Sequence, residues 1–124
     1  MRKIWFLGFT LMFLLFVLVG GAWADKAATS IEGPANAPKG SEVTIKITVT
    51  HSSNSALHHT EWLKVTGNNK EIGRWDFTGG KRPEAAVFTR EMKVRITEDL
   101  EVKAEANCNV HGSKGSSTLK ISVK

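Results

Sequence analysis

The sequence predicts an all-β protein, folded as an antiparallel β-sandwich of immunoglobulin-like type. Three observations support this class. Apolar residues recur at every second position in several segments, turn-forming residues separate those segments, and no segment shows a convincing helical period. About seven short strands in roughly 100 residues is the pattern of such a sandwich. No internal repeat is present.

The clearest alternation runs through 43–50, where valine and isoleucine on one face alternate with threonine and lysine on the other. The same period of two recurs in 86–96, with Arg90 as the exception, and in two later segments. Glycine, asparagine and proline mark turns at 38–40, 67–69, 79–83 and 112–117. We therefore expect strands near 30–32, 43–50, 59–65, 72–77, 86–96, 100–106 and 119–123.

The first 24 residues have the form of a secretory signal peptide. Met1-Arg2-Lys3 is a basic start, 4–19 is an apolar run, and Ala22-Trp23-Ala24 is a cleavage motif of the Ala-x-Ala kind. We expect cleavage after Ala24, which leaves residues 25–124 as a single exported domain, for example in the periplasm. A retained membrane anchor is the weaker alternative, because spanning a bilayer takes roughly 20 apolar residues.

The charge of the expected mature chain argues against nucleic-acid binding. Of the 17 basic residues, Arg2 and Lys3 leave with the signal, so the remaining 15 exceed the 12 acidic residues by three. Lysines and glutamates alternate along the strand-like segments without a basic run, which is typical of a solvated surface. Trp62 and Trp75 are expected in the hydrophobic core rather than in a ligand-binding platform.

The histidines and the one cysteine are clustered in the sequence. Cys108 precedes His111 by three residues, and His51, His58 and His59 lie within nine residues of one another. Thiolates and imidazoles are ligands of borderline and soft transition metals. Continuing the alternation of 43–49 by two positions reaches His51, and continuing that of 100–106 reaches Cys108. The pattern predicts a mononuclear metal site at the strand ends.

Two other interpretations remain open at this point. A single cysteine in an exported chain excludes an intrachain disulfide and leaves a free thiol, an intermolecular bridge or a metal ligand. Cys108 as a small buried hydrophobe would make the protein a metal-free immunoglobulin-like binding or scaffold module. A cupredoxin is the other alternative, but blue-copper sites usually add a methionine soon after the last histidine. Gly112-Ser113 follows here, and Met92 lies upstream.

Two motifs together resemble the superoxide reductases, that is, the neelaredoxins and the iron-binding domain of the desulfoferrodoxins. The first is His58-His59-Thr60-Glu61-Trp62, preceded by a histidine in a Ser/Asn-rich loop. The second is Cys108-Asn109-Val110-His111-Gly112. The resemblance covers nearly all of 25–124 and includes the segments 31–34, 39–40 and 82–85.

The resemblance implies an immunoglobulin-like sandwich carrying one iron that cycles between Fe(II) and Fe(III). Four histidine nitrogens would lie in a plane, with a cysteine sulfur on the axis opposite the substrate. Residue by residue, it assigns His51, His58, Cys108 and His111 as ligands, with His59 as the alternative to His58 because this loop is one residue longer than usual. The implied reaction reduces superoxide to hydrogen peroxide with electrons from an unidentified periplasmic donor.

The N-terminal segment departs from the family pattern. Family members usually carry Glu-Lys-His where this chain reads Asp25-Lys26-Ala27. Lys26 matches the lysine that attracts superoxide and helps protonate the peroxide, whereas Ala27 replaces the histidine that completes the plane. Three histidines and Cys108 could still bind iron, with a second position open. The alternative function is therefore a non-catalytic iron-binding or electron-transfer module on the same scaffold. Homo-oligomer formation is left open.

Overall fold

The computed structural model describes residues 26–124, and the expected signal peptide lies outside them. The described chain forms eight strands and no helix, so no helix within 26–124 is long and apolar enough to cross a membrane. The strands are β1 (Ala28–Glu32), β2 (Asn36–Ala37), β3 (Glu42–Thr50), β4 (Thr60–Gly67), β5 (Lys70–Asp76), β6 (Val87–Arg95), β7 (Leu100–Cys108) and β8 (Ser116–Val123).

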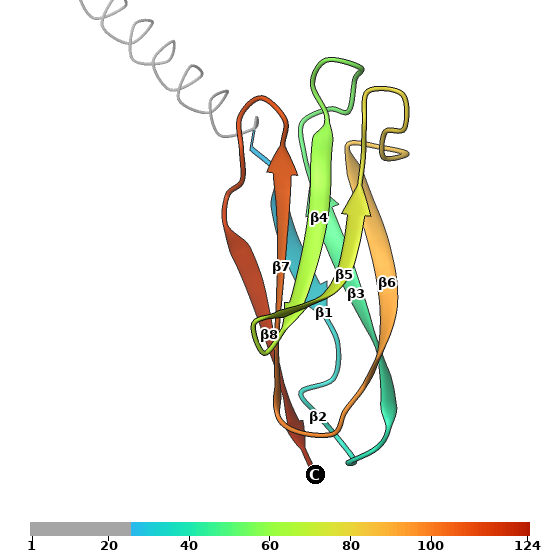
Figure 1. Cartoon of the computed structure of the whole chain (residues 1–124), viewed down its shortest axis with the longest axis vertical. Coiled ribbons are helices and arrows are strands. Elements are labelled where there is room, and N and C mark those ends of the chain that lie inside the picture. The colour runs from blue at the N-terminus through green and yellow to red at the C-terminus, as the bar shows by residue number, and fades with distance from the viewer. Residues whose placement is uncertain (1–25) are drawn as a thin grey trace, which may run out of the picture.

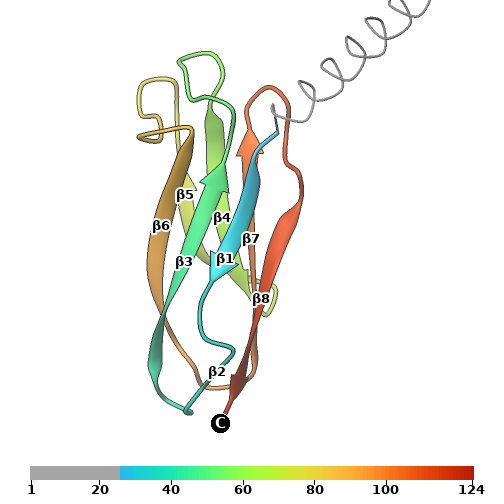
Figure 2. The same cartoon turned by 180° about the vertical axis from the view of Figure 1, so that it is seen from behind.

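These strands form two sheets packed face to face, seen from opposite sides in Figures 1 and 2. One sheet has the order β1-β3-β6 and the other β2-β8-β7-β4-β5. All pairings are antiparallel except that of β2 with β8. The prediction of an all-β, immunoglobulin-like sandwich is confirmed.

The strand that the sequence did not predict is β2. It has two residues, which pair in parallel with the end of β8, Asn36 with Ser122 and Ala37 with Val123. Two residues cannot display a period of two, so no sequence pattern marks this strand. The seven predicted segments each correspond to an observed strand, with bounds that differ by a few residues.

The core lies between the two sheets and follows the predicted alternation. In β3, Ile45, Ile47 and Val49 are fully buried, and Trp75 and Phe77 pack against this core while remaining partly exposed. The other fully or almost fully buried hydrophobic residues of the strands include Leu63, Val65, Phe88, Val102, Ala104, Ala106 and Ile121. All eight strands and the core between them lie within residues 26–124, so this segment has the elements and the hydrophobic core of a domain of its own.

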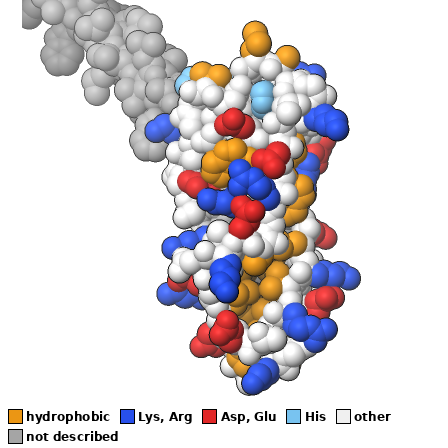
Figure 3. Space-filling view, viewed as in Figure 1, with side chains coloured by type: hydrophobic (Ala, Val, Ile, Leu, Met, Phe, Trp, Pro, Cys, Tyr) orange, Lys and Arg blue, Asp and Glu red, His pale blue; other side chains and the backbone are white. Residues whose placement is uncertain are grey.

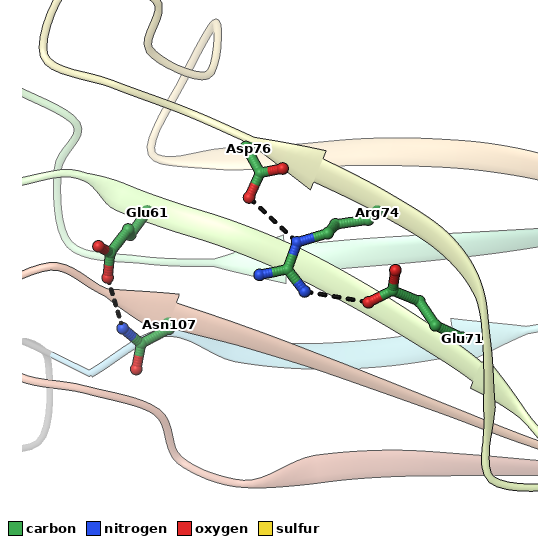
Figure 4. A network of polar contacts seen from close by, with 5 residues as sticks. All are labelled: Glu61, Glu71, Arg74, Asp76 and Asn107. Carbon is green, nitrogen blue, oxygen red and sulfur yellow. Dashed lines mark hydrogen bonds and ion pairs between the residues drawn. The ribbon is translucent and has the colours of Figure 1, made fainter.

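Trp62 does not join this core, so the expectation for this residue is wrong. It lies on the outer face of the five-stranded sheet, where Lys64 Nζ and Arg74 Cζ are each 5.6 Å from the centre of its ring. Arg74 in turn pairs with Glu71 at 3.0 Å and Asp76 at 3.2 Å, and these hydrogen bonds raise its pKa (Figure 4). The cations cover the indole, which is therefore a surface residue.

Three loops and the start of the described chain meet at one end of the sandwich, which we call the loop end (Figure 1). The loops are 51–59 between β3 and β4, 77–86 between β5 and β6, and 109–115 between β7 and β8. Residues 26–27 also belong to this end, because the Ala27 amide donates to the Gly112 carbonyl at 3.3 Å. Most of the metal ligands predicted from the sequence fall in these loops.

Candidate metal centre

Three of the predicted ligand residues converge at the loop end. Ligand atoms of His51, His58 and Cys108 all lie within 4.8 Å of one another. His51 directly follows β3 and Cys108 ends β7, and they are 4% and 1% exposed. The predicted core-facing parity of these two residues is therefore confirmed. His58 reaches them from the 51–59 loop, where its ring meets that of His51 edge to face at 4.9 Å.

His111 joins this group through a tight turn. The backbones of Cys108 and Gly112 exchange hydrogen bonds of 2.8 and 3.0 Å, and Gly112 takes a φ of +84°, which glycine adopts without strain. The turn places His111 Nδ1 3.2 Å from His58 Nε2 and 3.8 Å from Cys108 Sγ. The structure thus brings together all four residues that the sequence assigned.

The same turn aims a backbone donor at the sulfur. The His111 amide N–H donates to Cys108 Sγ over 3.4 Å. Hydrogen bonds of this kind orient the side chains that hold a metal. The donor lies in the same short turn as the ligand His111.

His59 lies outside the cluster. Its side chain is 7% exposed, and its Nδ1 donates to the Ser55 carbonyl oxygen at 3.2 Å. That hydrogen bond fixes the ring within its own loop and away from the group formed by His51, His58 and Cys108. Of the two adjacent histidines, the geometry favours His58 as the ligand.

The sequence did not single out Asn54, which positions His51. Asn54 Oδ1 accepts the Thr60 amide at 2.7 Å and lies 3.4 Å from His51 Nδ1, while its Nδ2 donates to the Ala85 carbonyl at 2.7 Å. Thr60 Oγ1 is also 3.4 Å from His51 Nδ1. Such partners orient a metal-binding imidazole through the nitrogen that does not face the metal. The one sequence signal for Asn54 is the Ser/Asn-rich composition of the loop.

Asn109 joins loop 51–59 to loop 109–115 through hydrogen bonds. Its side chain accepts the His59 amide at 3.0 Å and donates to the Leu57 carbonyl at 3.2 Å. Its own amide donates to the His59 carbonyl at 3.0 Å. These three bonds hold the segment of His58 against the turn of Cys108 and His111. The Cys-Asn-Val-His motif contained this residue, but its spacing did not reveal the role.

The N-terminal segment docks directly beside this turn. Ala27 is fully buried, pairs in parallel with Ser113, and accepts the Lys114 amide at 2.9 Å. Its methyl group offers no ligand atom, so the position matching the absent family histidine is filled by apolar packing. Lys26 immediately precedes it and is exposed at the loop end.

The imidazole and thiolate donors fit a borderline transition metal such as iron. Bonds of about 2.0–2.3 Å to nitrogen and sulfur put ligands on opposite sides of an ion about 4.4 Å apart, which matches donors spread over 4.8 Å. A blue-copper arrangement is less well supported. Met92, the one methionine within residues 26–124, packs its sulfur against Gly73 of β5 rather than in the cluster.

Comparison with known proteins agrees with this description. A family model for desulfoferrodoxin matches residues 22–115. A superoxide reductase (neelaredoxin) from Ignicoccus hospitalis aligns with a TM-score of 0.66 and 18% identity over 78% of this chain and 80% of its own. A candidate superoxide reductase from Thermotoga maritima aligns with a TM-score of 0.61 and 24% identity over 83% and 89%.

The same sandwich occurs in proteins of other kinds. The PKD domain of an M14-like peptidase from Thermoplasmatales archaeon SCGC AB-540-F20 aligns with a TM-score of 0.58 and 14% identity, over 81% of this chain and 97% of that domain. Among curated protein sequences, none matches the chain significantly. The fold alone therefore does not separate these groups, but the family model spans both ligand-bearing motifs and confirms the resemblance seen in the sequence. The chain belongs to the desulfoferrodoxin family.

Proposed function

We propose that this protein is an exported mononuclear non-haem iron protein that reduces superoxide to hydrogen peroxide. The observation that carries the proposal is the convergence of His51, His58 and Cys108 within 4.8 Å, with His111 in contact with two of them. Imidazole and thiolate ligands with an open position suit non-haem iron chemistry. Iron held there as Fe(II) would supply the single electron that, with two protons, converts superoxide to hydrogen peroxide.

The protein's own residues would hold the metal and exclude bulk water from one side of it. Cys108 and His51 lie on the core side, and both are almost fully buried. His58 and His111 are more exposed, which leaves the loop end as the side of approach for a small anion. Asn54 and Asn109 would keep the two loops in register when iron binds.

The charge of the loop end would draw superoxide toward the site. Four cations belong to its segments, Lys26, Lys81, Arg82 and Lys114, whereas Glu84 is the one carboxylate in loops 51–59, 77–86 and 109–115. Glu84 is itself paired with Arg90 at 2.9 Å. Net positive charge around a site raises the local concentration and the association rate of an anionic substrate.

A second candidate function is a non-catalytic iron-binding or electron-transfer module. The observation that favours it is Ala27, which is buried beside the turn of Cys108 and His111 and provides no imidazole. With three histidines instead of four, the iron would have a further position for water or another ligand. The affinity for iron and the reduction potential would both change.

Two variants separate these functions by pulse radiolysis. If the proposal holds, Lys26→Ala slows the reaction with superoxide, and the loss shrinks at high salt because ions screen the field. Ala27→His should raise iron affinity and the rate of superoxide reduction together, since position 27 already docks beside the turn. Lys39→Ala, at the opposite end of the sandwich, serves as the control and should change neither. A wild type that binds iron but does not react with superoxide, and is not improved by Ala27→His, would favour the non-catalytic module.

Export and the electron donor belong to the same proposal. Support for export is the form of residues 1–24, and the donor would be a periplasmic redox protein. Amino-terminal sequencing of the protein from the periplasmic fraction should begin at Asp25. Recovery of a chain that begins at Met1 in the cytoplasm would contradict this part.

A further inference from the structure

Two large apolar side chains project from the loop end into solvent. Leu57 is 86% exposed and Val110 is 59% exposed, and they account for half of the exposed large hydrophobic residues within 26–124. They lie on different loops that are tied together, because Asn109 next to Val110 donates its side-chain N–H to the Leu57 carbonyl at 3.2 Å. Figure 3 shows hydrophobic side chains at this end, near a histidine.

Four cations belong to segments of the same end. Lys81 and Arg82 belong to loop 77–86, which packs closely on loop 51–59: a Cβ on Gly79 would lie 2.6 Å from the Ala56 carbonyl oxygen. Lys114 lies in loop 109–115 with Val110, and its amide donates at 2.9 Å to the carbonyl of Ala27, the residue that follows Lys26. The loop end therefore combines two apolar side chains with four positive charges.

The chain that precedes the described domain also joins it here. Residues 1–25 connect at Lys26, and they contain the apolar run 4–19. Whenever that run is in a membrane, before cleavage or without it, the loop end is the part of the domain nearest to the lipid. Exposed apolar side chains together with Lys and Arg residues are the composition of an interfacial membrane-binding surface.

We propose that the loop end docks on an anionic lipid surface, with Leu57 and Val110 entering the headgroup region and Lys26, Lys81, Arg82 and Lys114 facing lipid phosphates. The candidate metal site would then open toward the membrane surface. The attachment of the apolar run at this same end favours a lipid surface over an acidic protein as the partner. This proposal does not depend on iron or on superoxide reduction.

Vesicle sedimentation of purified residues 25–124 tests it. Binding to vesicles of phosphatidylcholine and phosphatidylglycerol at 3:1 should be at least about tenfold tighter than to phosphatidylcholine alone, and should weaken with salt. Leu57→Ser with Val110→Ser should lower binding to anionic vesicles by about fivefold or more, since it removes the apolar contribution. Lys81→Gln with Arg82→Gln should lower it by about tenfold or more.

Matched controls use similar residues elsewhere on the sandwich. Ile72→Ser removes an exposed apolar side chain of β5 that lies near the turn at Gly67, and Lys39→Gln with Lys70→Gln removes two cations at the opposite end. Neither should change vesicle binding, and metal content should be equal in every variant. Absence of binding to anionic vesicles, equal losses in the controls, or binding that appears only with an acidic protein would each overturn the proposal.

Discussion

His58 and His59 are adjacent in the chain but have different surroundings. His58 Nε2 lies 3.2 Å from His111 Nδ1 and its ring meets that of His51, whereas His59 donates to the Ser55 carbonyl. A residue that binds a metal and a residue that fixes a loop should respond differently to truncation. The first should affect metal affinity, and the second should affect the stability of the loop.

We predict that His58→Ala lowers iron affinity by at least about tenfold, because loss of a ligand should cost no less than loss of an outer partner, which costs about 10–100-fold. His59→Ala should instead lower the free energy of unfolding by about 1 kcal/mol, through the lost hydrogen bond, with a much smaller change in affinity. Anaerobic iron titration and urea unfolding of the iron-free variants measure the two effects. A larger loss of iron affinity for His59→Ala than for His58→Ala would show that loop 51–59 directs His59, and not His58, toward the metal site.

At the scale of elements, the position of loop 51–59 depends on loop 77–86. Asn54 donates to the Ala85 carbonyl, the His51 amide donates to the Ala86 carbonyl at 3.0 Å, and Gly79 lies against Ala56. Loop 77–86 supplies no predicted ligand, yet it packs against the loop that carries His51 and His58. Its sequence is therefore constrained by packing at Gly79.

Replacing Gly79 by alanine tests the packing of loop 77–86 against loop 51–59. The new Cβ would meet the Ala56 backbone oxygen at 2.6 Å, so one of the two loops must shift. We expect Gly79→Ala to lower the free energy of unfolding by about 1–3 kcal/mol and to weaken iron binding. Gly80→Ala is the matched control, because nothing lies within 4 Å of its added Cβ, and it should be close to neutral. Equal effects of the two substitutions in urea unfolding would contradict this packing.

The same loop is joined to β6 by an ion pair that explains why Arg90 interrupts the apolar alternation. Arg90 sits at a core-facing position of β6, where its guanidinium lies 5.5 Å from the ring centre of Phe77 and 5.0 Å from that of Phe88. It also donates to both carboxylate oxygens of Glu84 at 2.9 and 3.0 Å. The hydrogen bonds from Arg90 hold the pKa of Glu84 below its ordinary value of 4.5.

This pair predicts a small pH dependence of stability. A carboxyl whose pKa is lower in the folded state stabilises the fold above its unfolded pKa, and the contribution is lost as pH falls through the folded value. Glu84 is largely exposed, so the contribution should be about 0.5 kcal/mol or less. The difference in unfolding free energy between wild type and Glu84→Gln should therefore be present at neutral pH and be lost as the pH falls below the ordinary pKa of Glu84, 4.5. A difference that grows on acidification would contradict the assignment.

At the scale of the whole molecule, much of the site could be predicted from periodicity. The alternation that buries Ile45, Ile47 and Val49 continues to His51, and the alternation in β7 continues to Cys108. A strand's side chains change face at each residue, so the parity of a core-facing segment fixes the face of the residue that ends it. The sequence alone was therefore enough to assign both candidate ligands, His51 and Cys108, to the core-facing side of their strands.

Other features depended on tertiary contacts that no local pattern records. β2 is too short to show a period, and Trp62 was assigned to the core because tryptophan is large and apolar, whereas Lys64 and Arg74 cover it on the surface. The roles of Asn54 and Asn109 arise only when loops far apart in the chain meet. The sequence motifs and their resemblance to a family supplied the candidate ligands, but they could not identify the residues that hold the loops together.

The most direct test of the iron centre is metal analysis with absorption spectroscopy on protein isolated anaerobically from its native compartment. We predict about one iron per chain, and on oxidation a thiolate-to-Fe(III) charge-transfer band that is absent in Cys108→Ser, because Cys108 is the one cysteine of the chain and lies in the histidine cluster. Stoichiometric zinc or copper without iron, or a band that survives in Cys108→Ser, would contradict the account.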